Sequence, residues 1–323
     1  MIVKEEEDRI QACLESMEGL VDYYVIAVDS KPESNKTFEI VSTVVGDRGL
    51  VYRQEWQDDF SIARNDALDK LLEHYPDTDY VFWADGDDIM ATPAQGAASF
   101  GDIRQRLESQ LPDAVIAPYV YGMDFVKEGV SPNLKYNRYR MWRNIQGQPK
   151  FRYWKGPIHE CDVLNHSAGR GDANWEDFII IHLKGEARPQ NSERNLRVLE
   201  RAHTQDPADS RTMYYLGREY KDGGQYEKSI AMLTKYVNSS QFAEEKYDAM
   251  LLIARMYNAV GNFDSALEWA KKALDFKPEI AFAATLIGDI YLSSKKNPSL
   301  ARPWYAYAAY APHGNVLFDD LPA

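Results

Sequence analysis

The chain has few cysteines and no long apolar run. Its two cysteines, Cys13 and Cys161, stand apart without a CxxC pair. A disulfide framework or a thiol catalyst is therefore not expected, and both are predicted to be small buried hydrophobic residues. No stretch of ~18 or more apolar residues occurs, and residues 1–10, MIVKEEEDRI, do not have the basic-then-apolar pattern of a signal peptide. We therefore expect a soluble cytoplasmic protein without a transmembrane segment.

Basic residues are in deficit, and the deficit lies in one part of the chain. The net charge is −13, with 37 Lys and Arg against 50 Asp and Glu. Residues 1–187 contain 20 basic and 33 acidic residues, whereas residues 188–323 contain 17 of each. A protein that reads nucleic acid has a basic surface, so nucleic acid is excluded as a partner. The acidic part is instead expected to need a cation.

The length of 323 residues favours two domains. Up to about residue 187, short β-rich runs alternate with helical periodicity, which is typical of βαβ units and a largely parallel sheet. Beyond residue 188 almost no strand pattern remains. We therefore predict an α/β domain over 1–187 and an all-α domain over 188–323. Strands are expected at 24–28, 50–52 and 80–84, with helices from Thr37 and over 60–74. Later strands at 114–121, 136–142, 151–154 and 178–183 are expected to extend the same sheet, some of them antiparallel.

The all-α part contains a repeat. The run Leu216-Gly217-Arg-Glu-Tyr220 recurs as Ile253-Ala254-Arg-Met-Tyr257 at an offset of 37 residues, and a weaker copy covers 287–291. Small residues where paired helices touch and an aromatic residue one turn later are what stacked helical hairpins require. These residues resemble the tetratricopeptide repeat over roughly 210–310. Repeats of this kind predict a protein partner or self-association.

Three carboxylates follow the predicted strand at 80–84, in the stretch Asp85-Gly86-Asp87-Asp88. Ligands of open α/β sheets bind beyond the carboxyl ends of the strands. Carboxylate oxygens suit Mg²⁺ or Mn²⁺, which bridge protein to substrate phosphates. A solvated acidic loop or a helix N-cap is an equal alternative for this tetrapeptide alone.

Further landmarks join this motif in a fixed order. Together they resemble an inverting family-2 glycosyltransferase of the GT-A fold, a Rossmann-like nucleotide-sugar-binding domain, followed by tetratricopeptide-like repeats. The landmarks are the stretch 1–7, Asp29, the stretch FSIARN at 60–65, the aspartate motif at 85–88, RMWR at 140–143, His159-Glu160 and His182.

This resemblance implies that a nucleotide-diphosphate sugar, most simply a UDP-sugar, binds across the first half of the sheet. Asp29 would face the base or ribose. Asp85, Asp87 and His182 would hold Mn²⁺ or Mg²⁺ on the diphosphate, and the cation would offset the charge of the leaving group. The residues expected to hold the donor are Asp29, Asp59, Arg64, Asn65, Asp85, Gly86, Arg140 and Lys155, with Arg143 a further source of positive charge. The alternative for His182 is a purely structural role, as a hydrogen-bonded histidine at a strand end.

Inversion requires a base that takes the proton of an acceptor hydroxyl. Glu160, in the stretch WKGPIHE, is the candidate, with His159 and Asp177 in reserve. A surface carboxylate beside a turn is the alternative for Glu160. The sequence does not identify the acceptor, which can be a glycan, a peptide or a small molecule.

Three functions from different classes are compatible with these patterns. We favour a metal-dependent inverting glycosyltransferase. The second is a repeat-type interaction protein whose α/β domain binds a nucleotide but no longer transfers sugar. The third is a metal-dependent phosphoryl- or nucleotidyl-transfer enzyme, which the lack of a GxxxxGK[ST] motif disfavours.

Overall fold

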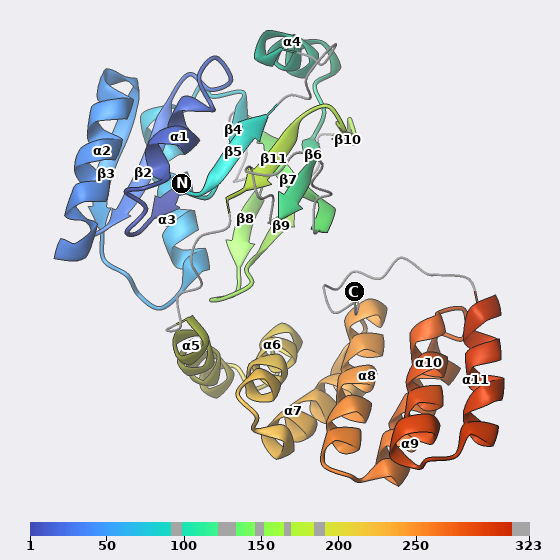
Figure 1. Ribbon diagram of the computed structural model, residues 1–323. Coiled ribbons are helices and arrows are strands. Elements are labelled where there is room, and N and C mark those ends of the chain that lie inside the picture. The colour runs from blue at the N-terminus through green and yellow to red at the C-terminus, as the bar shows by residue number, and fades with distance from the viewer. Residues whose placement is uncertain (92–98, 122–133, 146–151, 165–168, 184–190, 312–323) are drawn as a thin grey trace. The chain divides into compact units, whose positions relative to one another are not determined.

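The chain forms two compact units, Met1–Arg188 and Pro189–Ala323. The computed structural model describes residues 1–91, 99–121, 134–145, 152–164, 169–183 and 191–311 (Figure 1). The first unit is mixed α/β and the second is helical, as the change of pattern near residue 188 predicts. The expected boundary itself lies among residues 184–190, which are outside the described residues.

The first unit begins with a small parallel sheet. Its strands, in the order in which they pair, are β1 (Ile2–Val3), β2 (Tyr24–Asp29) and β3 (Gly49–Gln54). Every residue of β2 is buried, because helices cover both faces of the sheet. Asp29 pairs in register with Gln54, so the carboxyl ends of β2 and β3 lie side by side.

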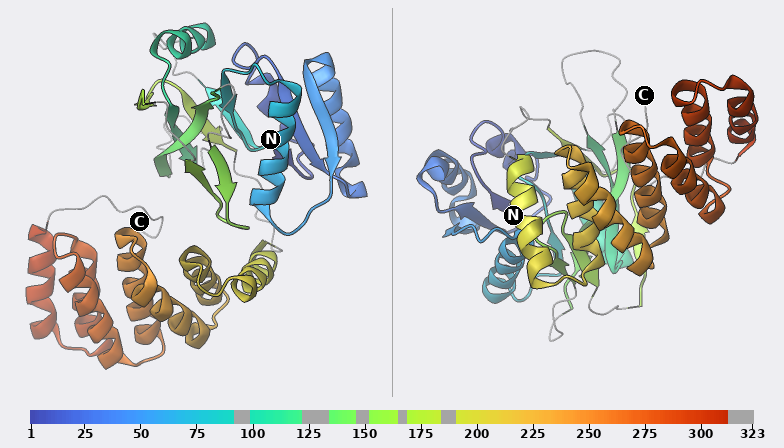
Figure 2. Two further views of the ribbon diagram at one scale, coloured as in Figure 1. Left: turned by 180° about the vertical axis from the view of Figure 1, so that it is seen from behind. Right: turned by 90° about the horizontal axis from the view of Figure 1, so that it is seen from below.

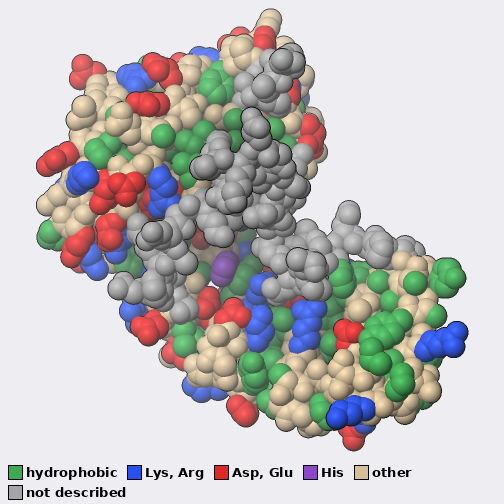
Figure 3. Space-filling model, viewed as in Figure 1, with side chains coloured by type: hydrophobic (Ala, Val, Ile, Leu, Met, Phe, Trp, Pro, Cys, Tyr) green, Lys and Arg blue, Asp and Glu red, His purple; other side chains and the backbone are tan. Residues whose placement is uncertain are grey.

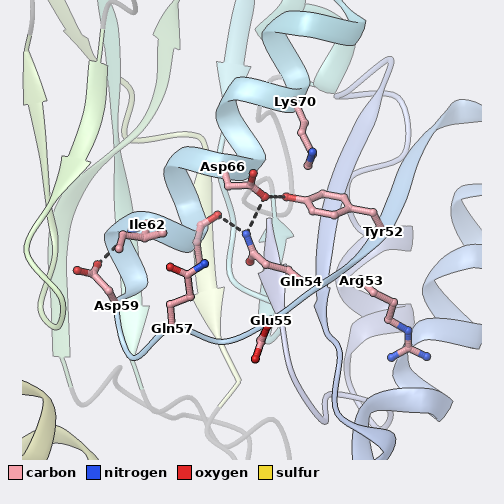
Figure 4. Close-up of a pocket in the computed structure, with 10 residues that line it drawn as sticks. Tyr52, Arg53, Gln54, Glu55, Gln57, Asp59, Ile62, Asp66 and Lys70 are labelled. Carbon is pink, nitrogen blue, oxygen red and sulfur yellow. Dashed lines mark hydrogen bonds between the residues drawn. The ribbon is translucent and has the colours of Figure 1, made fainter.

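Successive residues of β3 face opposite helices. The guanidinium of Arg53 stacks 4.0 Å above the ring of Phe38 in α2 (Asn35–Val45). The hydroxyl of Tyr52 donates to Asp66 Oδ2 of α3 (Phe60–His74) at 2.6 Å. Because side chains alternate along a strand, α2 and α3 cover opposite faces, as Figure 4 also shows. Helix α1 (Ile10–Glu15) packs against α2, and the short 3₁₀ turns are η1 (Pro32–Ser34) and η2 (Gly46–Arg48).

The second sheet is mixed rather than parallel. Its strand order is β4-β7-β6-β11-β5, with β10 added beside β6. The β4–β7, β7–β6 and β11–β5 pairs are antiparallel, whereas the β11–β6 and β10–β6 pairs are parallel. Antiparallel pairing was expected for some of the later strands, but not for β4. These strands form a sheet of their own and do not extend the parallel sheet of β1, β2 and β3, although the sequence had suggested that they would. The strands are β4 (Tyr80–Phe82), β5 (Asp88–Ala91), β6 (Ala114–Tyr121), β7 (Leu134–Arg143), β10 (Asp172–Asn174) and β11 (Ile179–His182).

Two smaller elements complete this unit. Strands β8 (Arg152–Lys155) and β9 (Cys161–Leu164) form a separate antiparallel pair. Helix α4 (Phe100–Gln110) begins with a capping box between Ser99 and Asp102. Cys13 is buried as predicted, whereas Cys161, at the start of β9, is partly exposed.

Strand β5, like β9 and β10, was not predicted from the sequence. It is short and directly follows the aspartate motif, so Asp88 begins a strand instead of lying on a solvated turn. Its pairing with β11 aligns Asp88 with His182, a residue distant in sequence.

The second unit is a row of paired helices (Figure 2). After α5 (Asn191–Gln205) the pairs are α6 (Ser210–Asp222) with α7 (Tyr226–Ser239), α8 (Ala243–Ala259) with α9 (Phe263–Phe276), and α10 (Ala281–Asp289) with α11 (Pro298–Tyr310). A π-helical turn, η3 (Ile290–Ser294), follows α10. No helix among the described residues is both long enough and apolar enough to cross a membrane.

The predicted small residues lie where paired helices touch. A Cβ added to Gly217 in α6 would lie 2.5 Å from Cδ2 of Leu233 in α7. Ser229 of α7 donates its hydroxyl to the Gly217 carbonyl at 2.6 Å, so its polar group is satisfied inside the pair. The corresponding Ala254 of α8 is fully buried. The helical-repeat prediction is therefore confirmed.

The last helices present apolar side chains to solvent. Hydrophobic side chains gather over the end of the unit that carries α10 and α11 (Figure 3). They include Leu292, Leu300, Tyr307 and Tyr310, of which Tyr310 is 90% exposed.

The contact at Gly217 leads to a stability prediction. Gly217→Ala should lower the free energy of unfolding by about 1–3 kcal/mol, because the methyl group overlaps Leu233. Urea denaturation followed by circular dichroism measures the change. As a control, Gly101→Ala in α4 has its nearest neighbour, Ser99 Oγ, at 3.4 Å and should be neutral or stabilising. Equal stabilisation by both changes would contradict the close contact.

Candidate functional site

Polar side chains from distant parts of the chain meet beyond β4 and β11. Asp87 and Asp88 follow β4, and His182 is the last residue of β11. One ligand atom from each of these three side chains lies within 4.8 Å of the others. His182 Nδ1 is 3.4 Å from Asp87 Oδ1 and 3.4 Å from Asp88 Oδ1. Among the described residues, this is the group that could hold a metal ion.

This group differs in one member from the set expected from the sequence. Asp87 and His182 belong to both sets, but Asp88 takes the position assigned to Asp85. The hydroxyl of Tyr119 in β6 donates to Asp88 Oδ1 at 2.9 Å and lies 3.0 Å from His182 Nδ1. Tyr119 was not identified from the sequence. The register of β11 between β5 and β6, which brings these residues together, cannot be read from local patterns.

Asp88 is held by a buried arginine. Arg140 Nη1 is 3.0 Å from Asp88 Oδ2, and both side chains are fully buried. The guanidinium of Arg140 lies 4.0 Å from the ring of Trp83 and 4.4 Å from the ring of Tyr119. Arg140 was expected to help hold the donor by adding fixed positive charge near the leaving diphosphate. In the structure it pairs with Asp88, and its Nε and Nη2 atoms have no hydrogen-bond partner among the described residues.

Asp85 and Glu160 share a second arginine. Arg64 Nη2 donates to Asp85 Oδ1 at 2.7 Å, and Arg64 Nε donates to Glu160 Oε1 at 2.6 Å. The Arg64 side chain is only 10% exposed and lies near the rings of Trp83 and Trp154. The structure thus brings Arg64, Asp85 and Glu160 together, as their shared assignment to one site predicts.

The ionisation of these groups follows from burial and neighbouring charge. Burial acts to raise the pKa of Asp85, but the charges of Arg64 and Arg140 hold that pKa well below its usual range. Burial raises the pKa of Asp87, and the nearby carboxylates of Asp85 and Asp88 add to the effect. A positive charge added beside Asp87 would therefore favour its ionised form.

Residues of the N-terminal stretch contribute contacts that the sequence did not assign. Arg9 Nη2 is 2.6 Å from Glu6 Oε2, and Arg9 Nη1 is 3.6 Å from Asp87 Oδ2. The same Arg9 Nη1 donates to the Leu183 carbonyl at 3.2 Å. The charged residues after β1 indicate that this stretch forms ion pairs. That Arg9 pairs with Asp87 depends on the fold and cannot be read from the sequence.

The start of α3 also carries predicted residues. Asp59 caps the helix, since its Oδ1 accepts from the Ile62 amide at 3.1 Å. Asn65 binds the backbone of Trp154 twice, as donor at 2.8 Å and as acceptor at 2.9 Å. Lys155 is exposed at the end of β8. His159 is exposed on the turn between β8 and β9 and has a left-handed backbone with φ of 51°.

Asp29 and Gly86 lie near the N-terminal stretch. Asp29 is buried at the end of β2, where Lys4 Nζ approaches its Oδ2 to 3.6 Å and the Lys31 amide donates to its Oδ1. A Cβ on Gly86 would lie 2.9 Å from Val3 Cγ1. Gly86 therefore permits tight packing against β1, which differs from the close ligand approach expected of it.

Two reserve residues lie away from this site. Arg143 pairs in register with Tyr80, at the start of β4, whereas the aspartates follow its end. Asp177 precedes β11 and forms an ion pair with Arg106 at 3.0 Å, whereas His182 ends that strand. Arg143 therefore lies beside the start of β4, and Asp177 lies before the start of β11. The aspartates and His182 lie at the other ends of these two strands.

A pocket of about 330 Å³ lies between β3 and the first turns of α3 (Figure 4). At its centre Asp66 Oδ2 accepts from both Tyr52 and Gln54, at 2.6 and 2.8 Å. Gln54 is the register partner of Asp29, so the pocket adjoins that strand end. Asp59 is the only predicted residue among its described lining, which is Tyr52, Arg53, Gln54, Glu55, Gln57, Asp59, Ile62, Ala63, Asp66 and Lys70.

Comparison with known proteins supports both parts of the sequence-based interpretation. The tetratricopeptide repeat family model matches residues 247–280. The chain is 25% identical over 272 residues to the SPbeta prophage-derived glycosyltransferase SunS of Bacillus subtilis and to the glycosyltransferase SunS of Bacillus phage SPbeta. The match covers 81% of this chain and 59% of each relative, so the chain spans about three fifths of their length.

Solved structures with similarity to the chain include two helical-repeat matches. One, titled MamA MSR-1, is 19% identical with a TM-score of 0.33 and covers 36% of this chain and 66% of its own. The other, Pseudomonas aeruginosa PilF, is 17% identical with a TM-score of 0.32 and covers 37% of this chain and 53% of its own.

The surroundings of His182 lead to a prediction about its titration. Burial acts to lower its pKa, but the hydrogen bond to Asp88 and the charges of Asp87, Asp88 and Asp85 outweigh burial and raise the pKa. An NMR titration in the presence of a chelator should give a midpoint above the usual value of about 6.5. The associated stability is present below about pH 6.5 and is lost as pH rises through the folded-state pKa.

Two variants test the cause of this shift. Asp87→Asn should lower the His182 midpoint, because it removes a neighbouring negative charge. Asp22→Asn, at a surface pair with Arg104, should leave the midpoint unchanged. A wild-type midpoint below about 6.5 would refute the assignment.

Proposed function

We propose that the chain is a metal-dependent inverting glycosyltransferase that moves a sugar from a nucleotide-diphosphate donor, most simply a UDP-sugar, to a hydroxyl acceptor. The observation that carries the proposal is the group Asp87, Asp88 and His182, within 4.8 Å of one another, beside the chain of contacts Asp85–Arg64–Glu160. The similarity to the SunS glycosyltransferases supports the reaction class. The family-2 and GT-A assignments rest on the ordered sequence landmarks.

The donor atoms of this group fit Mn²⁺ or Mg²⁺. Two carboxylate oxygens are hard ligands, and an imidazole nitrogen beside them makes Mn²⁺ the better match. In the network of ion pairs around the group, five carboxylates face three guanidinium groups. A bound divalent cation would supply Lewis-acid stabilisation of the departing nucleoside diphosphate. Asp87 and His182 would hold it, with Asp88 fixed behind them by Arg140.

The remaining residues act on the donor and the acceptor. Asp29, buried at the end of β2, would accept from the nucleotide base or ribose with its Oδ2, which has no hydrogen-bond partner among the described residues. Glu160 would take the proton of the acceptor hydroxyl while that oxygen attacks the anomeric carbon from the face opposite the diphosphate. The hydrogen bond from Arg64 Nε holds one oxygen of this carboxylate in place.

The helical repeats supply a second binding surface. Repeat proteins present extended surfaces to protein partners, and the match at 247–280 supports this role. The repeats would hold the acceptor or mediate self-association. The chemical class of the acceptor beyond its hydroxyl group is left to experiment.

Calorimetric titration with UDP tests the donor site. Wild-type protein should bind UDP in the presence of Mn²⁺ and lose most of that affinity with excess chelator, with GDP as the comparison nucleotide. Asp87→Ala should weaken the cation-dependent part at least about tenfold, because ligands of a metal and their supporting residues typically contribute that much. Equal affinity for wild type and variant would remove the metal role of Asp87.

A matched variant guards against unfolding as the cause. Asp22→Ala also removes an aspartate from an arginine pair, but on the surface, and should bind UDP like the wild type. If neither nucleotide binds to the folded wild type under any condition, the alternative function as a repeat-type interaction protein is favoured.

Glu160→Gln tests the base. The change keeps size and a hydrogen-bond acceptor for Arg64 but removes the proton-accepting carboxylate. Transfer should fall by about 10²–10⁴-fold, with UDP affinity preserved. Turnover is measured with the UDP-sugar and acceptor pair found by screening, and unchanged turnover would assign the base to another residue.

A further inference from the structure

We infer that the FSIARN segment at the start of α3 positions Glu160 by clamping the turn between β8 and β9. The resemblance to glycosyltransferases assigns this segment to the nucleotide, whereas most of its contacts are with residues 154–160. Arg64 and Asn65 are then positioning residues. The chemical consequence rests on the proposed function, while the clamp itself rests on geometry alone.

Three residues of the segment form the clamp, one at its start and two at its end. The Phe60 amide donates to the Pro157 carbonyl at 2.9 Å. Arg64 Nε donates to Glu160 Oε1 at 2.6 Å. Asn65 binds the backbone of Trp154 as both donor and acceptor, at 2.8 and 2.9 Å. The end of β8 at Trp154 and positions 157 and 160 of the turn are therefore all held by the same two turns of helix.

The turn needs such support, because its backbone is conformationally unusual. Gly156 has φ of 99° and His159 has φ of 51°, both in the left-handed region. Glycine adopts this region readily, but histidine does so at a cost. Glu160 directly follows this unfavourable residue. The position of its carboxylate thus depends on contacts from outside the turn.

The side chains of the clamp are committed to protein partners. Arg64 uses Nη2 for Asp85 and Nε for Glu160, and its side chain is only 10% exposed. Asn65 uses its carbonyl and its amide on one residue, Trp154. Because Arg64 also bonds to Asp85, the clamp ties Glu160 to the aspartate motif at a defined separation. This tie aligns the proposed base with the donor's reacting carbon.

Hydrogen exchange measures the clamp without reference to activity. In Asn65→Ala the Trp154 amide loses its acceptor, so exchange in residues 153–161 should speed up at least tenfold. In Arg64→Gln exchange should speed up around Glu160. The control is Asn144→Ala, which removes an asparagine that donates to the Thr78 carbonyl at 2.9 Å. Exchange in residues 153–161 should then stay at the wild-type rate.

Kinetics measure the consequence for the base. Turnover in Asn65→Ala should fall at least tenfold, with the KM for the donor and the calorimetric UDP affinity changed less than threefold. In the double variant Arg64→Gln with Glu160→Gln, turnover should be no lower than in Glu160→Gln alone, because both changes disable the same group.

The outcomes are separable. Unchanged exchange in Asn65→Ala would overturn the clamp. If that variant does not fold, exchange in Arg64→Gln decides the same question. A more than tenfold loss of UDP affinity in Arg64→Gln, with exchange unchanged, would return the segment to the nucleotide and overturn the inference. A third result separates the clamp from the proposed function. If exchange is faster in Asn65→Ala while the wild-type protein neither binds UDP nor transfers sugar, the clamp is supported and the proposed function is overturned.

Discussion

The first unit depends on the neutralisation of carboxylates that gather beyond two strands. Asp88 and Arg140 are both fully buried, and loss of either partner would leave an unpaired charge at a typical cost of about 3–5 kcal/mol. Arg64 and Arg9 each join two further carboxylates. These three arginines come from α3, β7 and the segment before α1. The ion pairs that neutralise the site therefore also hold these elements of the first unit together.

The helical unit is built on a different principle. Its contacts are between neighbours in sequence, and close approach at Gly217 and at the buried Ala254 determines how the pairs stack. Buried polar groups are satisfied across the pairs, as in the hydrogen bond from Tyr214 to Asp248 at 2.6 Å. Such a unit tolerates surface change while its stacking is preserved, which suits it to partner recognition.

Prediction from the sequence succeeded where a pattern is local. Helix α3 matches its expected range of 60–74, because its cap and periodicity lie within one window. The helical pairs were found from small and aromatic residues at a fixed offset. Strand β5, the burial of Arg140 and the role of Asp88 could not be predicted, because each depends on pairing with β7, β6 or β11. Arg64 was assigned to the right region, but its partner Glu160 lies 96 residues away in sequence.

The pairing of β11 with β5 also bears on how the protein is made. His182 and Asp88 are 94 residues apart in sequence. The chain between them must therefore fold back before Asp87, Asp88 and His182 can come together. Contacts of such high separation form late, since chain entropy must be lost before they stabilise anything. A nascent chain that has emerged only through Glu160 would hold the aspartates and the candidate base without the imidazole. The three side chains proposed to hold a cation should therefore come together only late in synthesis, after residue 182 has left the ribosome.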